Sequence, residues 1–328
     1  MQWKIARPGA FAEWLHHFGI RRGFPALAWI APRLPRWFLL AGARCVIFVV
    51  MFVHPAPKKA IARNLARILG APAESRRVRR AVRDLLHHFA YSWLDLFRFA
   101  QLPAARAEAL IVGGDRAALD PVRQAIARGE RLILMTAHLG NWELGGVILG
   151  KEDLPVAIVY VPDQFEVAEQ FRALLRGMGN LTEIPIRPDS QLASLPVLRA
   201  FSEGRMVALQ GDRDFNDRGQ LFDFFGAPAS FPTGPFHLAR MTGAKIWPTF
   251  IVYAADLRFV VEYGEAIEVE RGGDRDAAVR AAMARWVAIL EDAVRRHPTQ
   301  WHAFYDFWPD APAADAEPAI AAAGGAAR

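Results

Sequence analysis

The sequence predicts an α/β protein with a mixed, mostly parallel sheet flanked by helices. From about residue 130 onward, short apolar runs alternate with segments of helical periodicity, which is the pattern of βαβ units. The chain can also support a large core, since 53% of its 328 residues are hydrophobic and 23% are charged. This composition excludes a globally disordered chain.

The predicted strands are the short apolar runs at 131–136, 155–160, 183–186, 206–210, 246–253 and 258–263. The predicted helices are 58–70, 76–101, a helix from about Asn141, and 164–177, 191–203, 234–242 and 274–296. Between the fourth strand and the helix at 234–242 we expect a long polar loop, 211–233. We predict three parts: a basic and aromatic segment at 1–57, the α/β domain at 58–310, and an Ala-, Pro- and Gly-rich flexible tail at 311–328.

The first 80 residues are strongly basic, with 15 Lys and Arg against two acidic residues, whereas the whole chain has a net charge of only +6. Such asymmetry indicates an anionic partner: nucleic acid, an anionic bilayer or an acidic protein. The same stretch is rich in Trp and Phe, including Trp3, Trp14, Trp29, Trp37, Phe38, Phe48 and Phe52. Aromatic and basic residues together favour a membrane surface, and no nucleic-acid-binding motif is present.

The apolar run 37–53 is at the short limit for crossing a bilayer, and Arg44 lies near its middle. We therefore favour a helix that lies in the membrane interface. A single spanning helix is the second interpretation, and a buried amphipathic helix with basic flanks is the third.

Metal and disulfide chemistry have little support in the sequence. The single cysteine, Cys45, excludes a disulfide framework and a thiolate zinc site. The adjacent histidine pairs at 16–17 and 87–88 lack zinc-ligand spacing, and no Gly-x-Ser-x-Gly elbow of a serine hydrolase occurs. We expect no metal.

The most informative segment is 132–146. Its strand should deliver His138 to the loop at the strand's carboxyl end, where open α/β sheets bind ligands. Glu143 follows early in the next helix. A carboxylate that orients an imidazole makes the other ring nitrogen a general base for a hydroxyl. The spacing alone favours a simpler reading, in which Glu143 complements the helix dipole beside an incidental histidine.

The segment His138-Leu-Gly-Asn141-Trp142-Glu143 resembles the H-x-x-x-x-[DE] signature of the lysophospholipid-type acyltransferase superfamily. It is most similar to the branch of the lipid A late acyltransferases and the phosphatidylinositol mannoside acyltransferases. Further blocks resemble that branch in the same order: Asp212-Arg213-Asp214, Phe224-Phe225-Gly226, Phe231-Pro-Thr233-Gly234, the strand 246–253 and Pro298-Thr-Gln-Trp301. The resemblance extends from about residue 60 to 308.

This resemblance implies transfer of an acyl chain from acyl-carrier protein or acyl-CoA to a hydroxyl of a membrane lipid, with no further cofactor. It implies that His138 is the general base and Glu143 its orienting partner. The expected location is the cytoplasmic face of the inner membrane. The arginine cluster at 76–83 is a candidate docking surface for the acidic carrier protein, or else a solvated helix face.

The remaining candidate residues have two interpretations each. Asn141 and Trp142 shape the pocket, or begin a helix and fill the core. Asp212, Arg213 and Asp214 bind substrate at the sheet edge; Arg213 either neutralises an anionic group or pairs with the two aspartates. Thr233 and Gly234 offer helix amides to an anion, or Thr233 caps the helix. The phenylalanines line an acyl tunnel or are ordinary core residues: Phe224, Phe225 and Phe231.

Two departures bear on the acceptor. After Trp301 the chain is aromatic and acidic, where many lipid A enzymes have His-Arg-Arg, and Asp212-Arg213-Asp214 replaces the usual Asp-Gln-Asp. Both favour another acceptor, such as a glycolipid, an aminolipid or a lipid-linked pigment. A strict lipid A acyltransferase, a catalytically silent lipid-binding protein and a thioesterase that uses water remain alternatives.

Overall fold

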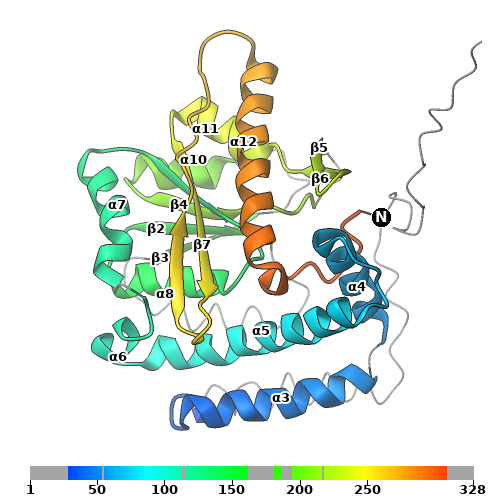
Figure 1. The fold of residues 1–328 in the computed structure, drawn as a ribbon. Coiled ribbons are helices and arrows are strands. Elements are labelled where there is room, and N and C mark those ends of the chain that lie inside the picture. The colour runs from blue at the N-terminus through cyan, green and yellow to red at the C-terminus, as the bar shows by residue number, and fades with distance from the viewer. Residues whose placement is uncertain are drawn as a thin grey trace, which may run out of the picture.

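A computed structural model describes residues 29–53, 55–112, 115–161, 181–186, 194–215 and 218–308 (Figure 1). Its main sheet has six strands in the order β3-β2-β4-β1-β7-β8. All neighbours are parallel except β7 and β8, which are antiparallel. The predicted α/β class with a mixed, mostly parallel sheet is therefore confirmed. The helix expected at 164–177, the residues Trp3 and Trp14, and the tail at 311–328 lie outside the described residues.

The strands of the main sheet are β1 Leu132–Thr136, β2 Val156–Tyr160, β3 Leu181–Pro185, β4 Met206–Gln210, β7 Lys245–Tyr253 and β8 Phe259–Tyr263. The helices are α3 Arg36–Val53, α4 Pro55–Leu69, α5 Arg76–Gln101, α6 Ala104–Glu108, α7 Asp115–Ala127, α8 Trp142–Lys151, α10 Leu195–Ser202, α11 Gly234–Thr242 and α12 Arg275–Arg296. A short 3₁₀ helix covers Pro298–Gln300. Most of these bounds lie within one to three residues of the prediction, whereas α6 and α7 were not predicted.

The sheet separates two apolar cores, because successive side chains of a strand point to opposite faces. In β1, Ile133 and Met135 pack with residues of α10, α11 and α12. Leu132 and Leu134 pack on the other face with residues of α3, α5, α7 and α8. Figure 1 shows the two helical layers on either side of the strands. This arrangement leaves the strand ends open for a site.

The expected loop at 211–233 is wrong, because it contains a hairpin. Strand β5, Gln220–Phe224, pairs antiparallel with β6, Ala227–Phe231. The two-residue turn has positive φ at both positions, 54° at Phe225 and 73° at Gly226, which is the conformation that suits the twist of a tight hairpin. Phe224 and Phe231 are fully buried, which confirms the core interpretation of these two rings.

Helix α3 packs one face against the protein and exposes the other. Leu39, Ala43 and Ile47 recur at helical spacing and are buried, and α3 lies along α5 (Figure 1). Trp37 and Phe48 are exposed, by 71% and 66%. No helix in the described part of the chain combines the length and the apolarity that crossing a bilayer requires. The interpretation of 37–53 as a spanning helix thus has no support.

Candidate active site

The register of the sheet brings His138 and Asp212 together. Strands β1 and β4 are parallel neighbours, and Thr136 at the end of β1 pairs with Gln210 at the end of β4. His138 and Asp212 each follow two residues later. Parallel strands place their carboxyl ends at one edge of the sheet, where α/β proteins bind ligands. The predicted positions of His138 after a buried strand and of Asp212 after another strand are therefore confirmed.

The His138 ring is oriented by the carboxylate of Asp212. Nδ1 of His138 lies 2.9 Å from Oδ1 of Asp212. An ionised carboxylate can only accept, so Nδ1 must carry the proton of this bond. Nε2 of a neutral ring is then left with the lone pair, which is the form that a general base requires. The side chain of His138 is 22% exposed and can be reached by a substrate.

Asp212 is held in turn by three N–H donors. Its Oδ1 accepts a hydrogen bond from Nδ1 of His138. Its Oδ2 accepts from the His138 backbone amide at 3.0 Å and from the Trp301 indole N–H at 3.2 Å. The residue is 2% exposed. Burial raises the pKa of Asp212, but the charge of His138 and these hydrogen bonds outweigh it, so this pKa lies below its ordinary value. Asp212 is therefore a fixed carboxylate that stabilises a protonated His138.

The loop after His138 requires a glycine. Gly140 has a φ of 66°, and a Cβ at this position would stand 2.0 Å from the carbonyl oxygen of Ile251. The Gly140 amide donates to Gln300 O at 2.8 Å, and the Asn141 amide donates to Ile251 O at 2.7 Å. The loop is thereby clamped between β7 and the Pro298–Gln300 turn.

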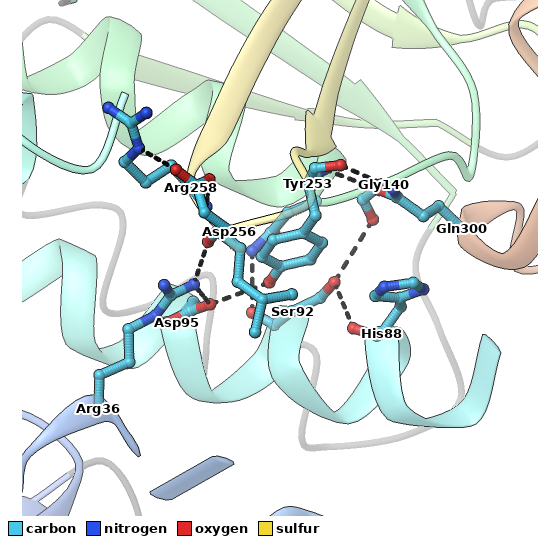
Figure 2. Close-up of polar contacts among 11 residues, drawn as sticks. Arg36, His88, Ser92, Asp95, Gly140, Tyr253, Asp256, Arg258 and Gln300 are labelled. Atoms are coloured by element: carbon cyan, nitrogen blue, oxygen red, sulfur yellow. Dashed lines mark hydrogen bonds and ion pairs between the residues drawn. The ribbon is translucent and has the colours of Figure 1, made fainter. Parts of the chain in front are cut away.

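A buried polar network continues this clamp to helices α5 and α3 (Figure 2). The side-chain amide of Gln300 makes two hydrogen bonds with the backbone of Tyr253, of 2.8 and 3.0 Å. The Tyr253 hydroxyl donates to Asp95 at 3.1 Å, and Asp95 accepts two bonds from Arg36, of 2.8 and 2.7 Å. Ser92, one turn before Asp95, donates to Gly140 O at 3.5 Å. The loop that contains Gly140 and helix α3 thus share one set of polar contacts.

Three residues of the H-x-x-x-x-[DE] segment stand at the start of α8: Asn141 is its N-cap, and Trp142 and Glu143 are its first two residues. Asn141 is buried and donates its side-chain amide to Ser92 O at 3.0 Å, so it fixes the loop to α5. The Trp142 ring lies edge-on to the His138 ring, with centroids 5.2 Å apart. Glu143 is the acidic residue of the first turn. Its role as the orienting partner of His138 stays a prediction, since the ring hydrogen bond described above is donated to Asp212.

The other candidate residues have different surroundings. The Arg213 guanidinium lies over two rings, 4.7 Å from the Phe215 centroid and 4.8 Å from that of Tyr305. Asp214 accepts from Gly219 N and from the Ser230 hydroxyl, so it orders its own loop.

Thr233 and Gly234 stand at the beginning of α11, as predicted. The Thr233 side chain makes no capping hydrogen bond there. The interpretation that Thr233 caps the helix with its side chain is therefore wrong. In the described part of the chain, neither residue hydrogen-bonds to His138 or Asp212.

Several residues of the site were missed by the sequence reasoning. Trp301 was recognised only as part of a motif, and its neighbour His302 donates its backbone amide to His138 O at 2.7 Å. Tyr253, Ser92 and Asp95 were taken as ordinary strand and helix residues. A polar residue on the apolar stripe of α5 was the available signal for Ser92 and Asp95, because such groups are buried only with partners.

The sequence was compared with known proteins. The model of a family described as bacterial lipid A biosynthesis acyltransferase matches residues 13–309. The chain belongs to this family. A phosphatidylinositol mannoside acyltransferase of Mycobacterium tuberculosis is 27% identical over 271 residues, 78% of each chain. Its counterpart in Mycolicibacterium smegmatis is 26% identical over 248 residues, 75% of this chain and 78% of that one. A lipid A biosynthesis acyltransferase of Haemophilus influenzae is 26% identical over 143 residues, 42% of each chain.

Family membership agrees with the resemblance found in the sequence, and it indicates an acyltransferase of lipid biosynthesis. The geometry is consistent with this chemistry, since a histidine oriented by a carboxylate can take a proton from a hydroxyl. Among the described residues, no group of three His, Cys, Asp or Glu side chains could hold a metal ion.

Proposed function

We propose that this protein transfers a fatty acyl chain from a thioester donor, acyl-carrier protein or acyl-CoA, to a hydroxyl of a membrane glycolipid. The observation that carries the proposal is the His138–Asp212 hydrogen bond at the shared edge of β1 and β4, in a chain that the acyltransferase family matches over most of its length.

The proposed reaction needs no covalent enzyme intermediate. The acceptor hydroxyl attacks the thioester carbonyl while Nε2 of His138 takes the hydroxyl proton. The tetrahedral intermediate then collapses, the C–S bond breaks, and the imidazolium returns the proton to the thiolate, so that an ester and a free thiol result. The buried Asp212 carboxylate holds the ring and stabilises its charge between the two steps.

Glu143 is proposed as a second carboxylate of the same site. It stands in the first turn of α8, next to Trp142, whose ring contacts His138. We retain the role that the motif implies, orientation of the catalytic base, as an assignment to be tested against Asp212.

A glycolipid acceptor other than lipid A is favoured. The relatives named phosphatidylinositol mannoside acyltransferase align with three quarters or more of the chain, whereas the lipid A relative aligns with 42%. The aromatic and acidic segment after Trp301 and the Asp212-Arg213-Asp214 triplet also depart from the lipid A pattern. Arg213, between two aromatic rings, is the proposed contact for an anionic group of donor or acceptor.

Peripheral attachment to the cytoplasmic face of the inner membrane is proposed through α3. Trp37, Phe38 and Phe48 are exposed on this helix, and aromatic side chains with nearby arginines are typical of interfacial anchors. Since α3 shares the Arg36–Asp95 contact with the rest of the protein, an attached α3 would hold the site near the lipid acceptor.

The first two turns of α5 are the proposed docking surface for acyl-carrier protein. Five exposed arginines gather there, Arg76, Arg77, Arg79, Arg80 and Arg83. Basic residues at a helix N-terminus oppose the helix dipole, so a benefit other than helix stability is expected for this cluster.

The deciding experiment measures acyl transfer by the purified protein in vesicles that contain extracted bacterial glycolipids, with acyl-CoA and acyl-carrier protein as separate donors. The wild-type protein should form an acylated glycolipid with one or both donors. His138→Ala should lower the rate by at least about 10³-fold, because the general base is lost, while the variant still folds and binds vesicles.

Two further arms separate the finer assignments. Replacing glycolipid by lipid A precursor tests the acceptor. Arg79→Glu with Arg80→Glu should raise KM for acyl-carrier protein several-fold and leave KM for acyl-CoA unchanged. Full transfer by His138→Ala would refute the mechanism, and donor binding without turnover by the wild-type protein would favour a catalytically silent lipid-binding protein.

A further inference from the structure

His302 is a buried histidine surrounded by aromatic rings. It is 5% exposed. Its ring stacks on Phe304, with centroids 5.9 Å apart and an interplanar angle of 12°, and lies 5.3 Å from Phe89 and 5.4 Å from Trp142. Among the described residues, neither ring nitrogen has a hydrogen-bond partner. A buried group in this condition destabilises the fold and calls for an explanation.

The ring lies beside the proposed base. Trp142 contacts both histidines, with its centroid 5.2 Å from that of His138 and 5.4 Å from that of His302. The backbone amide of His302 donates to His138 O at 2.7 Å, and Leu139 forms a β-bridge with Trp301. The segment carrying His302 is therefore fastened to the loop carrying His138, and the two side chains keep a fixed relation.

The chemistry of the ring limits what it can bind. Burial lowers the pKa of His302 to about 3, and the positive charges of His88 and His138 contribute in the same direction. The ring is thus neutral at physiological pH and offers one N–H donor and one lone pair. An uncharged oxygen matches these groups: a carbonyl accepts from the N–H, and a hydroxyl can also donate to the lone pair.

We propose that His302 is a substrate-binding residue, whose ring hydrogen-bonds to an uncharged oxygen of the substrates bound beside His138. The oxygen is the thioester carbonyl of the acyl donor or a hydroxyl of the lipid acceptor. This inference rests on the proposed acyl transfer, and it assigns a function to a group that otherwise only weakens the core.

The test is His302→Phe, which keeps an aromatic ring of similar size and removes both polar atoms. We expect kcat/KM to fall about tenfold or more, as the loss of a hydrogen bond to a substrate predicts. The unfolding midpoint should stay the same or rise, since the buried unsatisfied nitrogens are gone. A fall confined to KM for the acceptor points to its hydroxyl, and a fall in kcat or in the affinity for acyl-CoA points to the thioester carbonyl.

Two conservative variants and one control complete the design. His302→Asn and His302→Gln place an amide N–H near the positions of Nδ1 and Nε2, and one of them should restore part of kcat/KM without changing the midpoint. His237→Phe is the matched control. His237 lies near Arg275 and Asp276 at the beginning of α12, whereas His302 follows the far end of this 22-residue helix, so His237→Phe should keep wild-type kinetics.

Two results would overturn the inference alone: a wild-type kcat/KM in His302→Phe, or activity that only follows the unfolding midpoint across the three variants of His302. Absence of transfer by the wild-type protein with every donor and acceptor would instead overturn the proposed function, and this inference with it.

Discussion

Two buried aspartates, Asp212 and Asp95, have similar surroundings and different partners. Both are almost fully buried, with exposures of 2% and 1%, and both accept several hydrogen bonds. Asp212 accepts from a histidine whose side chain is 22% exposed. Asp95 accepts from Arg36 and from Tyr253, and burial and then the charge of Asp95 raise the pKa of Tyr253 well above its ordinary value. The partner of Asp212 is an imidazole, a side chain that can act as a general base, whereas arginine and tyrosine keep their protons.

The difference shows that burial and hydrogen bonding alone do not mark a catalytic carboxylate. An aspartate that pairs with arginine and tyrosine has partners that keep their protons, so it can only hold elements in place. An aspartate that pairs with an accessible histidine can stabilise a charge that appears and disappears during a reaction. The two regions are nevertheless connected, because Tyr253 and Gln300 extend from Asp95 to the Gly140 loop (Figure 2).

The largest expected effect is on catalysis by Asp212→Asn. An amide at this position no longer stabilises the imidazolium and permits the wrong ring tautomer, so kcat should fall by about three orders of magnitude. The matched control is Glu143→Gln, the same change at the other carboxylate. Steady-state kinetics of both variants decide which carboxylate orients His138: a larger loss in Asp212→Asn supports the contact in the structure, and a larger loss in Glu143→Gln supports the motif.

The sequence predicted which residues form this site better than which of these residues contact one another. His138 was selected as a residue that follows a buried strand, and Asp212 as part of a motif in a loop after another strand. Their contact depends on β4 lying next to β1, and neither segment carries information about that order. Glu143 was instead paired with His138 because the resemblance to the H-x-x-x-x-[DE] signature implies that role. Trp301 and His302, which complete the site, are far along the chain and reach it only through the tertiary fold.

The same limit explains the errors in the fold. The strands of the main sheet are contiguous apolar runs, and their bounds were predicted within one or two residues. The β5–β6 hairpin was missed because its turn places Phe225 at a φ of 54°, a conformation that side chains such as phenylalanine rarely adopt. Helix α7 was missed too, and it contains Pro121, a residue that usually argues against a helix interior.

A second prediction concerns stability and the other aspartate. Asp95→Asn leaves the Arg36 charge, which is only 17% exposed, without its counter-charge. The free energy of unfolding should fall by about 3 kcal/mol, whereas kcat of the folded protein should change less than about threefold. Urea unfolding and kinetics at low temperature measure the two effects.

The control for Asp95 removes both charges. In the double variant Arg36→Met with Asp95→Leu, no unpaired charge is buried, so most of the lost stability should return. A loss of kcat in Asp95→Asn as large as that in Asp212→Asn would contradict the distinction between the two carboxylates.

The smallest expected effect is the acid dependence of the stability that Asp212 provides. Its folded-state pKa lies below the ordinary value of 3.8, so the unfolded chain takes up the proton first as the pH falls. The ionised carboxylate therefore stabilises the fold above about pH 4, and this contribution is lost as the pH falls through the folded-state pKa. The difference in unfolding free energy between wild type and Asp212→Asn should shrink as the pH falls below about 4. Taking the difference cancels the titration of groups that lie far from Asp212 and behave alike in both proteins. A difference that does not shrink down to about pH 2 would show that the charge of Asp212 does not contribute to folding.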